Sequence, residues 1–177
     1  ACLLRTTRLD DPAAWRAWDG TGFTVAFADP ARDDIADPAR HLCAPVGVGS
    51  FGSAPSSLVR DAASGMFLAL QAGNMPHDGG TLPGVWLAAS RDLVDWSAPR
   101  LVWQIPVWRP RGCDPERDPA PWSLAYPALI DFASPTANFE TVSDAAWLYF
   151  TRYRLSGCEI THDRSLWRVR VGIGGDR

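Results

Sequence analysis

The chain has 177 residues, of which 46% are apolar and 21% are charged, and its net charge is −3. This length suits one globular domain with its own core, and the weak negative charge argues against a basic surface for nucleic acid or an anionic membrane. All 17 basic residues are arginine, which excludes a lysine Schiff base on this chain. The apolar runs are too short to span a bilayer.

Short strands are predicted along the whole chain. Apolar runs of strand length are bounded by Gly, Pro, Asp and Ser, and 15 Gly, 15 Pro and nine Trp suit strands joined by ordered loops. One short helical turn is predicted with Asp10 or Asp11 as its cap and Pro12 at its first position. The expected strands cover residues 2–9, 23–28, 57–60, 66–72, 85–90, 100–104, 128–131, 146–153 and 166–173. The sequence therefore predicts an all-β protein.

A phrase of strand, polar turn, tryptophan and strand occurs twice. LAASRDLVDWSAPRLV begins at Leu87, a looser copy LLRTTRLDDPAAWRAW begins at Leu3, and their tryptophans, Trp96 and Trp15, lie 81 positions apart. A period of this length fits a propeller blade of four antiparallel strands with long loops. We therefore expect about two and a half blades in a single partial propeller domain, 1–177. Residues 1–54 end one blade and cross over, 55–106 form a complete blade, and 107–177 hold a crossover and a final blade without its outer strand.

The stretch GVWLAASRDLVDWSAP resembles the strand–turn–strand phrase of five-bladed β-propeller glycoside hydrolases, the arabinanase and xylosidase-like group. YPALIDFASPTANFETVSDAAWLYFTR, followed by LWRVRV, resembles the final blade of secreted proteins related to that group. The resemblance implies the C-terminal half of a secreted five-bladed propeller. The implied function is hydrolysis of a plant or microbial polysaccharide that contains arabinose or xylose. A non-catalytic carbohydrate-binding propeller is the alternative, because related propellers include proteins without known activity.

Blade geometry separates structural residues from candidate binding residues. Asp92 is expected to accept backbone N–H bonds in its turn, Trp96 to pack between neighbouring blades, and Asp19 to act as Asp92 does. Asp131 ends an inner strand and is expected to be a structural hydrogen-bonding group. Glu140 is expected on the underside, away from any binding face.

The opposite, upper face is the expected binding face. Two loops on it, 73–84 and 155–165, carry histidines and carboxylates, and the two crossovers add arginine, histidine and aromatic residues. Aromatic faces stack on sugars while polar side chains bond their hydroxyls. Tyr126 and Ser56 begin inner strands and are expected to lie closest to the propeller axis. The predicted substrate-binding residues are Tyr126, Ser56, Trp122, His77, His41, His162 and Arg109.

Glycoside hydrolysis needs two carboxylates that flank the scissile bond. Asp78 and Glu159 are the candidates on this face, although the resemblance places the main carboxylates on earlier blades, outside this chain. No G-x-S-x-G or H-E-x-x-H motif is present, which argues against a serine hydrolase and a zinc hydrolase. No cofactor is therefore expected, and the resemblance allows only a calcium ion at the propeller axis.

Four cysteines, Cys2, Cys43, Cys113 and Cys158, lack the paired spacing of metal sites. Two structural disulfides in an oxidising compartment are expected, with buried free thiols as the alternative. Of the three connectivities, Cys2–Cys43 with Cys113–Cys158 is favoured, since each bond would tie a crossover to an adjacent loop of the binding face. This arrangement predicts a secreted protein.

The open sheet edges of an incomplete propeller predict a partner besides carbohydrate. Long unpaired strand edges invite pairing with another chain. A second polypeptide that carries the earlier blades is expected, such as the other half of a nicked precursor, and closure by a homodimer is the second option. A chain that begins at Ala1 without a signal peptide is expected to be a processed product or a fragment.

Overall fold

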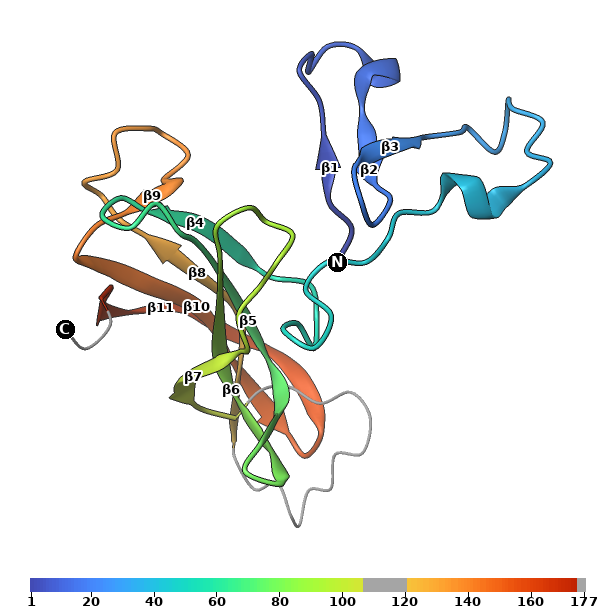
Figure 1. Cartoon of the computed structure of the whole chain (residues 1–177). Coiled ribbons are helices and arrows are strands. Elements are labelled where there is room, and N and C mark those ends of the chain that lie inside the picture. The colour runs from blue at the N-terminus through green and yellow to red at the C-terminus, as the bar shows by residue number, and fades with distance from the viewer. Residues whose placement is uncertain (107–120, 175–177) are drawn as a thin grey trace.

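The computed structural model describes residues 1–106 and 121–174, and nearly all regular structure in these residues is β. Three sheets are present (Figure 1). The two larger sheets pack against each other, while the small N-terminal sheet projects away from them. The all-β prediction is confirmed. No helix in the described ranges is long and apolar enough to cross a membrane.

The N-terminal sheet has three short strands in the order β1-β2-β3, namely β1 (Leu4–Arg5), β2 (Arg16–Trp18) and β3 (Phe23–Ala26). The expected helical turn is the 3₁₀ helix η1 (Pro12–Ala14), and the carboxylate of its cap Asp11 accepts a hydrogen bond from the Ala13 amide at 2.9 Å. The strands expected over 2–9 and 23–28 do not include β2, although the repeated phrase places a strand after Trp15, where β2 lies. Strand β2 lies in the middle of the sheet, where Ala17 is buried and pairs on both sides.

A second 3₁₀ helix, η2 (Pro38–His41), follows in the long segment that leads from β3 to the next sheet. Pro38 occupies its first turn, and the Asp37 carboxylate accepts a hydrogen bond from the Ala39 amide at 3.1 Å. This helix therefore repeats the Asp-Pro start of η1, because proline has no amide hydrogen to leave unpaired.

The second sheet is an antiparallel meander of four strands, as expected, with one addition. It runs β7-β6-β5-β4-β9, with β4 (Ser57–Asp61), β5 (Phe67–His77), β6 (Gly80–Ser90), β7 (Arg100–Gln104) and β9 (Thr141–Val142). The short strand β9 pairs in parallel with the end of β4, which was not predicted. It covers an edge of β4 that would otherwise be open.

The third sheet runs β11-β10-β8, with β8 (Trp122–Ile130), β10 (Ala145–Ser156) and β11 (Glu159–Gly172). Its three strands are the three predicted for the last part of the chain. β11 pairs with β10 on one side, and no strand in the described residues pairs with its other side. The sheet therefore ends in a long unpaired edge.

Two expected loops are instead continuous hairpins. Strands β5 and β6 stay paired up to His77 and Gly80, so a two-residue turn of Asp78 and Gly79 replaces the loop expected over 73–84. Both turn residues have positive φ, 46° and 78°, as the hairpin turn favoured by Asp-Gly requires. The loop expected over 155–165 is likewise a two-residue turn, because Ser156 pairs with Glu159.

The core lies between the second and third sheets. Alternate residues of β10, namely Ala146, Leu148 and Phe150, are buried and face this layer. The edges of the two sheets also meet, since the Ser56 hydroxyl donates to the Pro127 carbonyl oxygen at 2.6 Å. The main buried apolar partners are Val59, Leu70, Val85, Leu124 and Leu129.

The turn after β6 has the structural role that was predicted. The Asp92 carboxylate accepts hydrogen bonds from the amides of Val94 and Asp95, each at 2.9 Å. Asp19 does the same in the N-terminal sheet, where it accepts from two backbone amides. The Trp96 ring packs edge-to-face on Phe51 of the crossover, at 5.0 Å between centroids, and Trp96 also lines a hollow with Trp18 and Gly20 of the N-terminal sheet.

Gln71 fastens the crossover to the second sheet. Its side chain is buried, its Oε1 accepts from the amides of Gly52 and Ser53 at 2.8 and 3.1 Å, and its Nε2 donates to the Ser50 carbonyl at 2.8 Å. A buried polar group that loses its partners costs more than the bond contributed.

The variant Gln71→Leu, which keeps the side-chain volume, is expected to lower the free energy of unfolding by about 2 kcal/mol. It leaves the Gly52 and Ser53 amides and the Ser50 carbonyl without their partner. Urea unfolding followed by tryptophan fluorescence measures the change, with Gln104→Leu on the exposed side of β7 as the control. Equal stabilities of the two variants would contradict this role.

The disulfide Cys2–Cys43 is present, as predicted, and joins the start of the chain to the crossover. None of the cysteines that the structure describes is a free thiol. The partner predicted for Cys158 is Cys113, which lies outside the described residues.

Candidate functional site

Tyr126 and Ser56, both predicted to lie closest to the propeller axis, line the same hollow between the crossover and β8. Tyr126 lies inside β8 and not, as was expected, at the start of a strand. The hollow has a volume of about 260 Å³. Its walls come from both larger sheets and from the crossover, so residues far apart in sequence meet here. The lining residues are Ser53, Ala54, Ser56, Ala72, Leu124, Ala125, Tyr126 and Pro127.

The backbone presents Tyr126 to solvent. Its φ is +55°, a left-handed conformation that is unusual for a tyrosine, and 70% of the residue is exposed. The pairing of β8 with β10 shifts register here, between the pairs Ala128–Tyr149 and Ala125–Thr151. Pro127 accounts for the shift, because proline has no amide hydrogen to donate to the ladder. The bulge therefore turns a large aromatic ring outward at the edge of the hollow.

Tyr153 and Arg164 extend this site and were not among the predicted site residues. Burial raises the pKa of Tyr153, and the electrostatic influence of the neighbouring Tyr126 raises it further. The guanidinium carbon of Arg164 lies 5.5 Å from the centre of the Tyr153 ring. Alternation along the expected strand 146–153 already places Tyr153 on the same face as Trp147, Tyr149 and Thr151, so this signal was present in the sequence.

The hairpin of β5 and β6 carries His77 and Asp78 at its tip. The His77 Nε2 lies 3.3 Å from an Asp78 carboxylate oxygen, and the His77 ring packs edge-to-face on Trp86 at 5.8 Å between centroids. Asp78 is the first residue of the tight turn, where its positive φ shapes the hairpin. These contacts of His77 and Asp78 are therefore with residues of the same hairpin.

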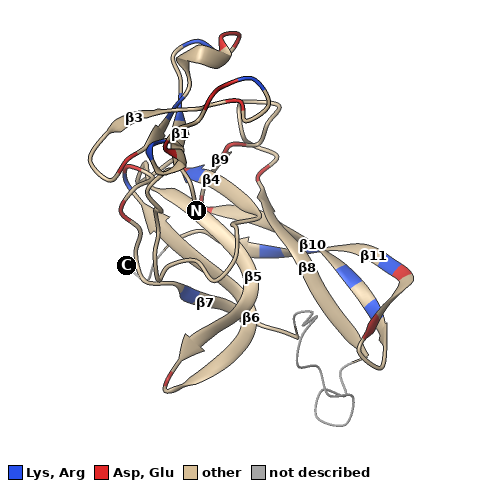
Figure 2. Cartoon of the chain, turned by 90° about the vertical axis from the view of Figure 1, so that its right-hand side faces the viewer, with Lys and Arg blue, Asp and Glu red and all other residues tan. Residues whose placement is uncertain are grey.

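Glu159 and His162 lie on a different hairpin, at the start of β11, and both are exposed. Figure 2 shows that the tips of the β5–β6 and β10–β11 hairpins point to different sides of the molecule. The two candidate carboxylates, Asp78 and Glu159, therefore stand on hairpins that diverge.

Trp122 takes part in a stack rather than an open platform. The guanidinium carbon of Arg152 lies 3.8 Å from the centre of the Trp122 ring and 4.3 Å from that of Trp167. An arginine between two indole rings is a strong cation–π arrangement. One face of Trp122 is thus covered by Arg152.

His41 belongs to η2 in the N-terminal part, where its Nδ1 lies 3.0 Å from the Ala26 carbonyl oxygen. It borders a separate hollow with Thr24, Asp34 and Arg40. This part projects away from the two larger sheets (Figure 1). Arg109 lies outside the described residues.

Asp131 is buried and structural, as predicted. It accepts hydrogen bonds from the Ser143 hydroxyl at 2.6 Å and from the amides of Ala133 and Ser143, each at 2.9 Å. These donors, the Ser143 hydroxyl first, hold the pKa of Asp131 below its usual value. In residues 1–106 and 121–174, no three His, Cys, Asp or Glu side chains gather as metal ligands.

Comparisons with protein-family models, with curated proteins and with solved structures found no match to this chain.

Proposed function

We propose that this chain is the C-terminal part of a secreted five-bladed β-propeller that binds carbohydrate, and that Tyr126 is its stacking platform. The observation that carries the proposal is the exposed, left-handed Tyr126 on the rim of a hollow that also contains Ser56. Strained residues with exposed functional side chains are typical of binding sites. Tyrosine next to hydroxyl and guanidinium groups suits a sugar, which has apolar faces and polar edges.

The propeller assignment draws support from the arrangement of the sheets. Two antiparallel meanders pack face to face, and the first strands of both meet through the Ser56–Pro127 hydrogen bond and through the Ser57 hydroxyl, which accepts from the Leu129 amide at 3.1 Å. Adjacent blades meet in this manner around a propeller axis. On this assignment the chain carries about two and a half blades.

Glycan binding is favoured over hydrolysis for the chain by itself. A glycosidase needs two carboxylates on either side of the scissile bond, at most about 9.5 Å apart. Asp78 and Glu159 belong to divergent hairpins, and the Tyr126 hollow has no carboxylate among its lining residues. Hydrolysis of an arabinose- or xylose-containing glycan would then require carboxylates from another part of the propeller.

The variant Tyr126→Gly is expected to weaken binding of arabinan or xylan fragments by at least about tenfold, because it removes a central aromatic contact. Glycine accepts the positive φ at this position, so the variant is expected to fold at least as stably as the parent chain. Affinity electrophoresis in gels that contain each polysaccharide measures binding, and thermal unfolding measures stability.

Phe27→Ala is the matched control, since Phe27 is also an exposed aromatic residue, at 52%, but lies in the N-terminal part. Its retardation in the gels is expected to equal that of the parent. If Tyr126→Gly is retarded as strongly as the parent chain, Tyr126 is not the platform. Release of reducing ends from the same polysaccharides by the parent chain would show hydrolysis instead.

We also propose that a second polypeptide with the earlier blades completes the third sheet. The unpaired edge of β11 supports this, since the strand runs over 14 residues and includes the exposed Leu166. Native mass spectrometry of the purified protein is expected to show a complex heavier than the chain mass of 19.3 kDa. A mass of twice this value would indicate a homodimer, and a monodisperse monomer would contradict the proposal.

A further inference from the structure

A second hollow, larger than the one at Tyr126, opens between the two larger sheets. It lies where the β4–β5 turn, the start of β7 and the end of β11 meet. This end of the sheets is opposite the tips of the β5–β6 and β10–β11 hairpins. Its volume is about 470 Å³, within the usual range for small-molecule sites. We call it the lower groove.

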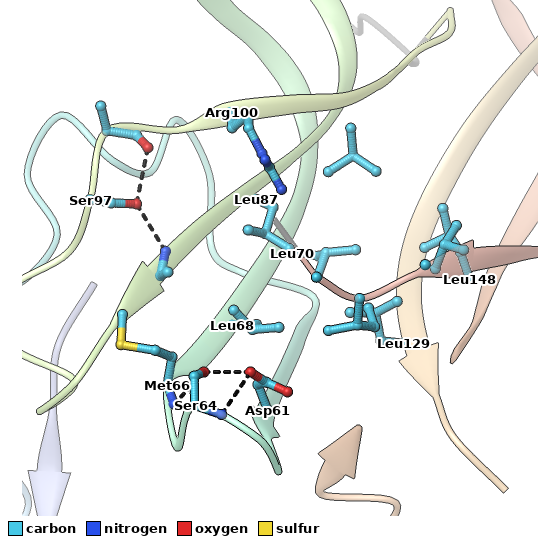
Figure 3. Close-up of a pocket in the computed structure, with 17 residues that line it drawn as sticks. Asp61, Ser64, Met66, Leu68, Leu70, Leu87, Ser97, Arg100, Leu129 and Leu148 are labelled. Atoms are coloured by element: carbon cyan, nitrogen blue, oxygen red, sulfur yellow. Dashed lines mark hydrogen bonds between the residues drawn. The ribbon is translucent and has the colours of Figure 1, made fainter. Parts of the chain in front are cut away.

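The walls of the lower groove are apolar. Leucines of four strands converge on it in Figure 3, Leu70 from β5, Leu87 from β6, Leu129 from β8 and Leu148 from β10. These side chains belong to the two faces that form the core, and at this end the sheets leave space between them. Such a surface favours a ligand with an apolar body.

Two charged side chains, Asp61 and Arg100, border the lower groove, and they differ in their partners. The Asp61 carboxylate is engaged by its own turn, where it accepts from the Ser64 hydroxyl and from the amides of Ser64 and Ala63 at 3.1 and 3.3 Å. These bonds, the Ser64 hydroxyl first, lower the pKa of Asp61 and keep it ionised.

Arg100, by contrast, has no ion pair or side-chain hydrogen bond with any residue in 1–106 or 121–174. In Figure 3 its side chain extends from β7 toward Leu87 and Leu70. A guanidinium group offers paired donors that match a carboxylate. The lower groove therefore combines apolar walls with one cation that has no ionic partner among the described residues.

We propose that the lower groove binds a small amphipathic carboxylate, with its hydrocarbon chain among the leucines and its carboxylate on Arg100. The groove is separate from the hollow at Tyr126, with no lining residue in common. The inference therefore stands independently of the proposed glycan binding. It also differs from docking of a second chain on β11, which would use the strand edge.

Titration calorimetry with linear fatty acids tests this assignment. Decanoate is expected to bind one per chain and about 15-fold more tightly than octanoate, since each buried methylene raises affinity about fourfold. Decanol is expected to bind about tenfold more weakly than decanoate, because it lacks the charge that pairs with Arg100. Decyltrimethylammonium, with the opposite charge, is expected not to bind.

Arg100→Met keeps an apolar stem and removes the charge, so it is expected to weaken decanoate about tenfold and to leave decanol unchanged. Arg91→Met is the control, since Arg91 is exposed in the β6–β7 turn and does not line the groove. A second variant, Ala89→Met, fills the groove from β6 and is expected to abolish binding of both ligands. The proposal would be overturned if decanoate and decanol bound with equal affinity, or if Arg100→Met had no effect on decanoate binding. It would also be overturned if the chain formed a dimer whose interface fills the groove.

Discussion

The double variant Cys2→Ser with Cys43→Ser is expected to lose about 4 kcal/mol of stability in the N-terminal sheet, by the chain-entropy model of cross-linking. The bond spans 41 positions in sequence, so its removal frees a long loop in the unfolded chain. The sheet that it braces is small, with strands of two, three and four residues. It cannot compensate the loss with a large core of its own.

Limited proteolysis followed by mass spectrometry measures this effect. We expect rapid cleavage within residues 1–46 of the double variant, while β4–β6 and β8–β11 stay protected, because their core does not include the N-terminal sheet. The parent chain under the same conditions is the control. Cleavage of the double variant at the parent's rate and sites would contradict the bracing role of the disulfide.

The variant Asp131→Ala is expected to lower the free energy of unfolding by about 3 kcal/mol, since it leaves buried donors without an acceptor. The carboxylate accepts from the Ser143 hydroxyl and from two backbone amides, and it lies just after β8. Through Ser143 the carboxylate also holds the segment that follows β9. Strand β9 itself pairs with β4. The loss is therefore expected to spread to both larger sheets.

Urea unfolding of Asp131→Ala, Asp131→Asn and Asp144→Ala tests this prediction. Asparagine keeps one acceptor oxygen and is expected to cost less than alanine. Asp144 is an exposed neighbour without a side-chain hydrogen bond in the described residues, and its replacement is expected to change stability by less than about 0.5 kcal/mol. A cost for Asp131→Ala no larger than that for Asp144→Ala would refute the structural role.

The Asp131 carboxylate also contributes to a pH dependence of stability. The pKa values of Asp61, Asp92 and Asp131 are lowered in the folded chain by the hydrogen bonds that they accept. Such groups stabilise the folded state above their unfolded pKa of about 4, and the contribution is lost as the pH falls through the lower folded values. Stability measured between pH 6 and pH 2 is expected to fall with acidification, and less steeply in Asp131→Asn.

Much of the fold follows from local patterns. The meander of β4 to β7 was predicted from short apolar runs, and the Asp92 turn and the Asp11 cap were predicted from residue types whose bonds reach only two or three positions along the chain. The ends of the β5–β6 hairpin were not predicted, although Asp78–Gly79 is a strong turn signal. Polar residues before and after it, such as Asn74 and Thr81, were interpreted as part of a loop.

The candidate site was predicted only in part. Tyr126 and Ser56 line one hollow, but Tyr126 lies inside β8 (Trp122–Ile130) and not, as the sequence had predicted, at the start of a strand. The partners of other residues depended on pairings across sheets that no local pattern encodes. The stack of Trp122, Arg152 and Trp167 is one example, because it joins residues of three strands.

The sequence by itself determined that this protein is built of β-strands and which of its aspartates brace turns. These properties depend on alternation and on hydrogen bonds between near neighbours in the chain. Tertiary structure alone decided that β9 covers the edge of β4 and that Tyr153 lies beside Tyr126. It also decided that the sheets leave the lower groove open beside Arg100. Such features arise from packing between segments distant in sequence, where the shape of one surface selects the residues of another.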